Sequence, residues 1–97
     1  MSSPEIHRFV VISTGHLTEG TARFLDTTPA KNWPYAGGPY ADYGWFFYAH
    51  DENLNTGSGA IPDDLFAVMT WARKQGCHYL LLDCDGNAVD DLPQFDW

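Results

Sequence analysis

Three short segments of the chain each hold a continuous apolar run rather than an alternation of polar and apolar side chains. They span residues 7–14, 43–50 and 77–83. Apolar runs of this length, bounded by turn residues, are typical of interior strands that are covered on both faces. The pattern therefore predicts a sheet that needs packing partners above and below.

Two other segments carry the signals of a helix. Thr18 can cap a short helix that runs to about Asp26, with Glu19 placed in its first turn. A second helix begins at Pro62, a residue suited to the first helical position, and ends near Lys74. Its apolar residues recur at helical spacing and form one stripe: Leu65, Val68, Met69 and Ala72.

The remaining segments carry turn chemistry. Residues 27–41 combine three prolines and two glycines with large aromatic side chains, which predicts an ordered loop folded over the sheet. Residues 51–60 form a polar loop. After the third apolar run, Asp85, Gly86 and Asn87 supply the turn of a hairpin into a further strand over residues 88–92.

Together these elements predict one small domain, residues 1–97, of the α/β class, with α+β as the alternative. We expect the order β-α-β-α-β-β, in a mixed sheet of three to four strands with two helices and a C-terminal hairpin. Two helices cannot cover both faces of this sheet. The loop around Trp33, the tail at residues 95–97 or a second copy of the chain must cover the rest, so a homodimer is one expectation.

The chain is strongly acidic, with 13 acids against five bases and a formal charge of −8. The last base is Lys74, and every charged side chain after it is an aspartate. Because lysine and arginine supply most of the affinity for nucleic acid, we expect no direct nucleic-acid binding and instead a basic protein partner. The alternative is that the charge only keeps the protein dispersed. The expected contact acids are Asp63, Asp64, Asp83, Asp85, Asp90, Asp91 and Asp96.

Apolar and aromatic content bears on location and on interfaces. Apolar runs such as residues 9–12 are far too short to span a bilayer, so we expect a cytoplasmic protein without membrane contact. Aromatic residues concentrate between residues 33 and 48 with only Lys31 nearby, which argues against a nucleotide-stacking platform. We expect core packing or a protein interface around Trp33, Tyr35 and Trp45.

One stretch imitates a catalytic motif. Residues 80–87, Leu-Leu-Leu-Asp-Cys-Asp-Gly-Asn, are similar to the strand-end signature of haloacid-dehalogenase-like phosphatases, whose first aspartate is a nucleophile. That family carries the motif on its first strand, whereas here it lies near the end of the chain, so we interpret Asp83 and Asp85 as turn residues. The histidine and aspartate spacings fit neither zinc nor an EF-hand, and Cys77 and Cys84 are expected to be reduced. We therefore assign no catalytic residue, metal or cofactor.

Three stretches together resemble a known family: Val-Ile-Ser-Thr-Gly-His-Leu-Thr (11–18), Asp-Tyr-Gly-Trp-Phe (42–46) and Asp-Asp-Leu-Pro-Gln-Phe-Asp-Trp (90–97). They are similar to an uncharacterised family of short acidic proteins encoded on bacterial plasmids and other mobile elements, with no established activity or site. The resemblance implies a cytosolic bacterial protein. Small acidic proteins of such elements often inhibit host defence by docking on DNA-binding surfaces of restriction or CRISPR machinery.

The resulting hypothesis is a non-enzymatic, DNA-mimic-like binding protein of the anti-restriction or anti-CRISPR type that docks on a basic surface. One alternative is a small enzyme or ligand-binding domain that uses the strand-end region around His16 and Asp83. The other alternative is a dimeric accessory subunit.

Overall fold

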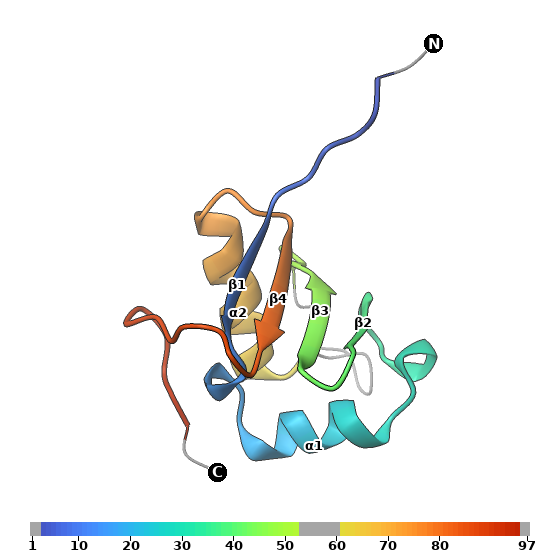
Figure 1. The fold of residues 1–97 in the computed structure, drawn as a ribbon, viewed down its shortest axis with the longest axis vertical. Helices are drawn as coiled ribbons and strands as arrows, with labels where there is room; N and C mark the ends of the chain where they lie inside the picture. The colour runs from blue at the N-terminus through green and yellow to red at the C-terminus, as the bar shows by residue number, and fades with distance from the viewer. Residues whose placement is uncertain (1–2, 53–60, 96–97) are drawn as a thin grey trace.

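A computed structural model describes residues 3–52 and 61–95 of the chain. In chain order the elements are β1 (Phe9–Ser13), the 3-10 turn η1 (Thr14–His16), α1 (Glu19–Thr27), the 3-10 turn η2 (Ala30–Asn32), β2 (Gly37–Tyr40), β3 (Gly44–Tyr48), α2 (Asp63–Lys74) and β4 (Tyr79–Asp83). Figure 1 shows the sheet from its open side, with α2 behind it and α1 below. The predicted mixed α/β domain with two helices is confirmed.

The four strands form one sheet in the order β1-β4-β3-β2. β4 is an interior strand, which pairs in parallel with β1 and in antiparallel with β3. In this register Leu81 lies between Val11 on one side and Phe46 on the other. The carboxyl ends of β1 and β4 therefore meet at the same end of the sheet, beside the start of β3.

The fourth strand is β2, which the sequence assigned to a loop. Gly37 pairs with Phe47, and Pro39 pairs with Trp45. A Cβ atom on Gly37 would lie 2.5 Å from the carbonyl oxygen of Phe46, so only glycine allows this close approach. A proline is tolerated because β2 is an edge strand, where a missing N–H costs no ladder hydrogen bond on the outer side.

The predicted hairpin strand at residues 88–92 is wrong. After β4 the chain makes one hydrogen bond to the edge of the sheet, from Ser13 N–H to Asn87 C=O (3.1 Å), and then leaves it. Leu92 N–H donates to Val89 C=O (3.4 Å), and the Leu92 side chain is buried in the core. The segment therefore forms a turn, because burying the Leu92 side chain is more favourable than adding a further strand to the sheet.

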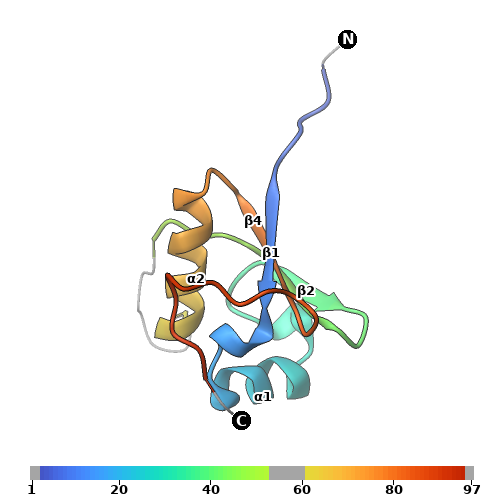
Figure 2. The same ribbon diagram turned by 60° about the vertical axis from the view of Figure 1, so that its left-hand side comes forward.

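The hydrophobic core lies between the helices and one face of the sheet. Ile12, Leu80 and Phe47 point to this face and are almost fully buried. The predicted stripe of α2, from Leu65 to Ala72, packs against them, which confirms the second helix and its register. Figure 2 shows α2 on one side of the sheet, with no helix on the opposite side in the described residues.

The expectation that the strands are covered on both faces is wrong for β1. Phe9 is 54% exposed and Val11 is 43% exposed, and both point away from the helices. The loop around Trp33 was expected to cover this face, but it packs on the core face of the sheet. There the ring centroid of Trp33 lies 5.6 Å from that of the core residue Phe47. Residues 3–52 and 61–95 therefore leave one face of the sheet open.

No helix in the described residues is long and apolar enough to cross a membrane.

Candidate functional site

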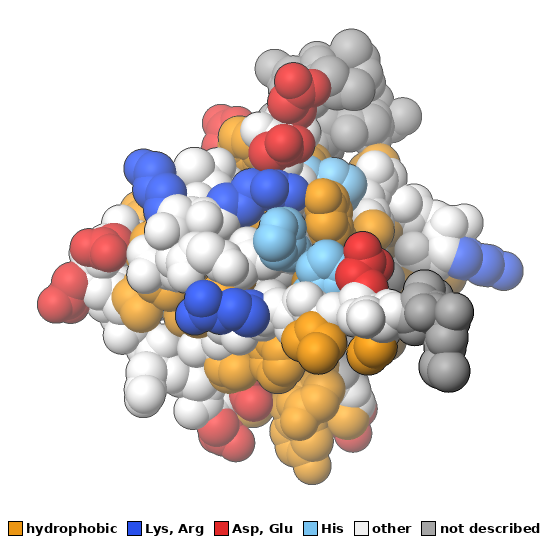
Figure 3. Space-filling view, turned by 90° about the horizontal axis from the view of Figure 1, so that it is seen from above, with side chains coloured by type: hydrophobic (Ala, Val, Ile, Leu, Met, Phe, Trp, Pro, Cys, Tyr) orange, Lys and Arg blue, Asp and Glu red, His pale blue; other side chains and the backbone are white. Residues whose placement is uncertain are grey.

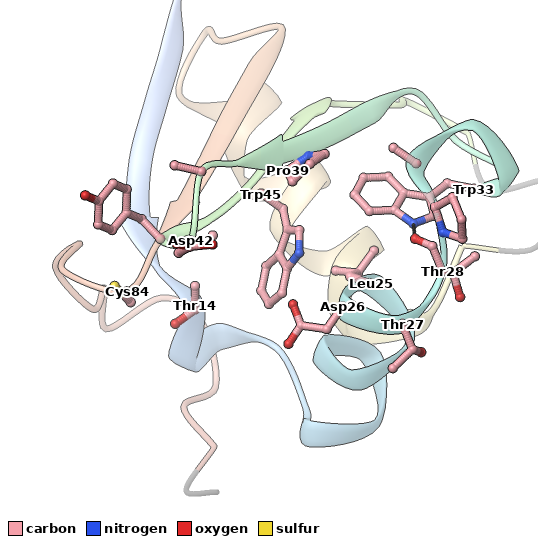
Figure 4. Close-up of a pocket in the computed structure, with 15 residues that line it drawn as sticks. Thr14, Leu25, Asp26, Thr27, Thr28, Trp33, Pro39, Asp42, Trp45 and Cys84 are labelled. Carbon is pink, nitrogen blue, oxygen red and sulfur yellow. Dashed lines mark hydrogen bonds between the residues drawn. The ribbon is translucent and has the colours of Figure 1, made fainter.

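A groove opens at the carboxyl ends of β1 and β4, between α1 and the turn that joins β2 to β3. Its volume is about 620 Å³. Thr14 and Cys84 line it at the strand ends, and Trp33 and Trp45 form apolar walls (Figure 4). Asp26 and Asp42 also line it, from α1 and from the β2–β3 turn.

The end of α1 positions the first of these carboxylates. Thr18 caps the start of this helix, since its side-chain oxygen accepts a hydrogen bond from Thr21 N–H. Asp26 lies in the last turn, which holds no basic residue. A carboxylate at this place opposes the negative end of the helix dipole and costs about 0.3–1 kcal/mol. The stability of α1 therefore does not explain why an acid stands at position 26.

The β2–β3 turn positions the second carboxylate. Tyr43 N–H donates to Tyr40 C=O (3.0 Å), and between them Ala41 adopts a left-handed conformation with φ 46°. This conformation costs a residue with a Cβ atom on the order of 1 kcal/mol. Cys84 N–H donates to Tyr43 C=O (2.7 Å), so the turn that carries Asp42 is fixed to the end of β4.

The turn after β4 brings two further acids to the same end of the sheet. Asp85 N–H donates to Asp83 Oδ1 (3.0 Å), and Gly86 N–H donates to Asp83 C=O (2.8 Å). Asp83 and Asp85 flank Cys84, which lines the groove. Asp83 and Asp85 therefore take part in a turn, as interpreted from the sequence, in which a carboxylate oxygen of Asp83 accepts a backbone N–H.

The groove is suited to a cation with an apolar stem. Among the described residues that line it, two are aspartates and none is lysine, arginine or histidine. The indole rings of Trp33 and Trp45 are each 7% exposed, so they offer the stem of such a side chain a small apolar contact. A lysine or arginine side chain can place its aliphatic stem on such walls while its charge meets the carboxylates.

His16, the residue proposed for a strand-end enzyme, has a structural role instead. It is 1% exposed, and its Nδ1 lies 2.8 Å from Pro93 C=O while its Nε2 lies 3.0 Å from Val89 N. Since a carbonyl only accepts and an amide N–H only donates, Nδ1 carries the proton and Nε2 accepts. Both ring nitrogens are engaged by the chain itself, so the pairing of His16 with Asp83 as a catalytic site is not supported.

The other predicted contact acids lie in two separate places. Asp63 is exposed at the start of α2, whereas Asp64 accepts hydrogen bonds from Thr18 N–H (2.8 Å) and Thr21 Oγ1–H (2.9 Å). Asp90 is exposed in the C-terminal segment, and Asp91 accepts from Trp71 Nε1–H at 3.2 Å. Asp96 lies outside the described residues. The acids therefore do not form one continuous edge, and Asp64 acts as a cap that joins the starts of α1 and α2.

The three aromatic residues predicted at an interface are core residues. Trp33, Tyr35 and Trp45 are 7%, 6% and 7% exposed. Burial and the nearby Asp64 carboxylate raise the pKa of Tyr35 to about 12. The Tyr35 hydroxyl has no hydrogen-bond partner among residues 3–52 and 61–95. These rings are therefore mainly core residues, and only Trp33 and Trp45 present the small exposed part of their indoles to the groove.

The two cysteines were predicted to be reduced, and two acids of the groove were not predicted. Cys77 is buried and Cys84 is exposed, and both are free thiols, as expected. Asp26 and Asp42 were missed. The sequence held a clue to each acid. Asp26 lies at the helix end where a carboxylate is unfavourable, and Asp42 is the first residue of the Asp-Tyr-Gly-Trp-Phe stretch.

Comparisons with curated proteins and with solved structures find no match. A family model does match, over residues 9–97, and it is described as the C-terminal domain of a family of unknown function, DUF5983. The matched residues include every strand and helix and all residues of the groove. The chain therefore belongs to the DUF5983 family.

Proposed function

We propose that this protein is a non-enzymatic binding domain that docks on a basic protein surface, with the strand-end groove receiving an arginine or lysine side chain of the partner. The observation that carries the proposal is the groove itself. It combines two tryptophan walls with the carboxylates of Asp26 and Asp42, and no base lies among its described lining residues. Asp83 and Asp85 add two charges at its strand-end side.

The charge of the whole chain supports docking on a basic partner. A formal charge of −8 on 97 residues creates a long-range field that speeds encounter with a positive surface. Such a field adds little specificity, because it acts on any basic protein. The groove supplies the specificity, since its walls favour a planar guanidinium over a compact ammonium group.

The finer proposal concerns the class of partner. A DNA-binding protein of host defence presents a basic groove lined with arginine and lysine side chains, to which this acidic domain would bind in place of DNA. The resemblance to acidic proteins of plasmids and mobile elements supports this reading. In this form the protein inhibits restriction or CRISPR machinery from the bacterial cytoplasm.

The test compares two variants that lose the same charge. Asp26→Asn with Asp42→Asn removes the two carboxylates that line the groove. The control, Asp63→Asn with Asp90→Asn, removes two exposed carboxylates that do not line it. Each protein is titrated by calorimetry with an oligo-arginine peptide and with an oligo-lysine peptide of equal length at about 0.15 M salt.

The proposal predicts that the groove variant binds oligo-arginine at least about tenfold more weakly than the wild type, because the two exposed carboxylates that line one groove are lost together. The control variant should change the affinity by no more than about twofold, since its carboxylates contribute only to the screened field. Oligo-arginine should bind more tightly than oligo-lysine. Equal losses in the two variants would show that binding depends on net charge alone, and the groove would then have no role.

A further inference from the structure

The β2–β3 turn carries two exposed aromatic side chains at the rim of the groove. Tyr40 is 44% exposed and Tyr43 is 51% exposed, and their ring centroids lie 5.8 Å apart. Asp42 stands between them in the chain, and both Asp42 and Tyr43 line the groove. Neither tyrosine belongs to the hydrophobic core of the described residues. The exposed faces of both rings are therefore open to a partner.

The backbone of the turn is held in a strained conformation. Ala41 has φ 46°, in the left-handed region that a residue with a Cβ atom seldom adopts. The hydrogen bond from Cys84 N–H to Tyr43 C=O and the close approach of Gly44 to Leu82 C=O hold the turn against β4. Strain of this kind, maintained by surrounding contacts, is frequent at ligand-binding positions. The turn is therefore preorganised to present its rings and its carboxylate together.

The charged groups beside the turn are all negative in the described part of the chain. Asp26 and Asp42 line the groove, and neither forms an ion pair within residues 3–52 and 61–95. Figure 3 views the other end of the sheet, where β1 and β4 begin, and shows histidines there with side chains of both charges around them. The bases of the described chain therefore leave the carboxylates of the groove open to a cation from a partner.

We infer that Tyr43 is the residue by which the groove selects arginine over lysine, because a partner's guanidinium stacks on its ring while donating to the Asp42 carboxylate. This role rests on the proposed function, since it names the source of specificity in the same groove. A guanidinium is planar, carries its N–H donors at its edge and is weakly hydrated, so it can stack and donate at once. The ammonium of lysine has no flat face and is strongly hydrated, so it gains less from the ring.

The tryptophans of the groove contribute little to this selectivity. Trp33 and Trp45 are buried, and Trp33 Nε1–H already donates to Thr28 C=O (2.9 Å). Their small exposed parts can contact only an aliphatic stem, which lysine and arginine share. Tyr43 is the most exposed aromatic residue among the described residues that line the groove. The difference between the two cations is therefore sensed at Tyr43.

The test compares three variants by calorimetric titration with oligo-arginine and oligo-lysine peptides of equal length at about 0.15 M salt. Tyr43→Leu removes the ring, Tyr43→Phe keeps it, and Phe24→Leu removes an exposed ring of α1 that does not line the groove. Tyr43→Leu should bind oligo-arginine about three- to fivefold more weakly, and oligo-lysine less than twofold more weakly. Tyr43→Phe and Phe24→Leu should keep the wild-type ratio of the two affinities.

Proton NMR of the bound peptide tests the stacked contact directly. The ring current of Tyr43 should move the δ-methylene protons of arginine upfield in the wild type and in Tyr43→Phe, but not in Tyr43→Leu.

The outcomes separate this role of Tyr43 from the proposed function. No upfield shift in the wild type, or an unchanged affinity ratio in Tyr43→Leu, would overturn the role of Tyr43. The proposed function would stand in that case if Asp26→Asn with Asp42→Asn still weakened binding of oligo-arginine more than its control. Equal binding by the groove variant and its control would overturn both.

Discussion

Replacement of His16 should remove the hydrogen bonds that hold the C-terminal segment against the rest of the domain. The His16 ring bonds Val89 N–H and Pro93 C=O, more than 70 residues further along the chain, and it is 1% exposed. In His16→Ala the half-buried Val89 N–H loses its acceptor, which costs about 1–3 kcal/mol. The Pro93 carbonyl belongs to an exposed residue and can turn to water, so its loss costs nearer 0.5–1 kcal/mol. Loss of ring burial adds about 1–2 kcal/mol.

These contributions sum to about 2.5–6 kcal/mol, a large share of the 5–15 kcal/mol by which a domain of this size is stable. The assay is urea unfolding followed by tryptophan fluorescence, with the slope of the transition checked for a constant value. His16→Asn is the matched control, because its Nδ2–H₂ can still donate to Pro93 C=O while the bond to Val89 N–H is lost. We expect His16→Asn to lose about 0.5–1 kcal/mol less than His16→Ala. A cost below about 1 kcal/mol for His16→Ala would refute the structural role of this residue.

Further predictions concern single side chains. Asp64→Ala should lower the free energy of unfolding by about 2–3 kcal/mol in urea, since three hydrogen-bond donors at the start of α1 lose their acceptor, while binding of oligo-arginine stays unchanged. Tyr35→Phe should leave stability at pH 7 unchanged or raise it by up to about 1 kcal/mol, because the hydroxyl has no partner in the described chain. The pKa of Tyr35, raised to about 12, makes the wild type lose stability at high pH, because the hydroxyl ionises from pH 10 in the unfolded chain but only near pH 12 in the folded one. This loss, roughly 2–3 kcal/mol, develops as pH rises from 10 through 12, and urea titrations across that range should show it in the wild type but not in Tyr35→Phe. Gly44→Ala should unfold the β3–β4 pairing, since the new Cβ would meet Leu82 C=O far inside van der Waals contact, and circular dichroism should show loss of the native spectrum.

Hydrophobic period and turn chemistry predicted much of the fold. The stripe from Leu65 to Ala72 identified α2, and the three apolar runs identified β1, β3 and β4. Gly37–Tyr40 could not be recognised, because Gly-Gly-Pro-Tyr lacks the β-branched residues that favour a strand, and the partner strand β3 alone determines its conformation. The turn at residues 85–87 was predicted, but the direction of the chain after it was not. Burial of Leu92 in the core decides that direction, and it is a tertiary effect.

The site was harder to predict than the fold, because charge along a sequence does not show which carboxylates meet in space. Asp64 and Asp83 resembled exposed contact acids, yet each accepts backbone or side-chain hydrogen bonds. Asp26 and Asp42 are far apart in sequence and come together only through the packing of α1 beside the β2–β3 turn. Apolar runs on β1 and β3 indicated cover on both faces, but they could not show that the described part of the chain covers only one.

The most direct test of the central claim uses the indole of Trp45, which lines the groove, as a reporter. Oligo-arginine is titrated into ¹⁵N-labelled protein, and the shifts of the Trp45 Nε1–H and of the Asp42 and Asp90 backbone amides are followed. The account predicts saturable shifts of the Trp45 indole and the Asp42 amide, with little change at Asp90. Shifts centred on Asp90, or spread evenly over all exposed acids while Trp45 stays unchanged, would contradict it.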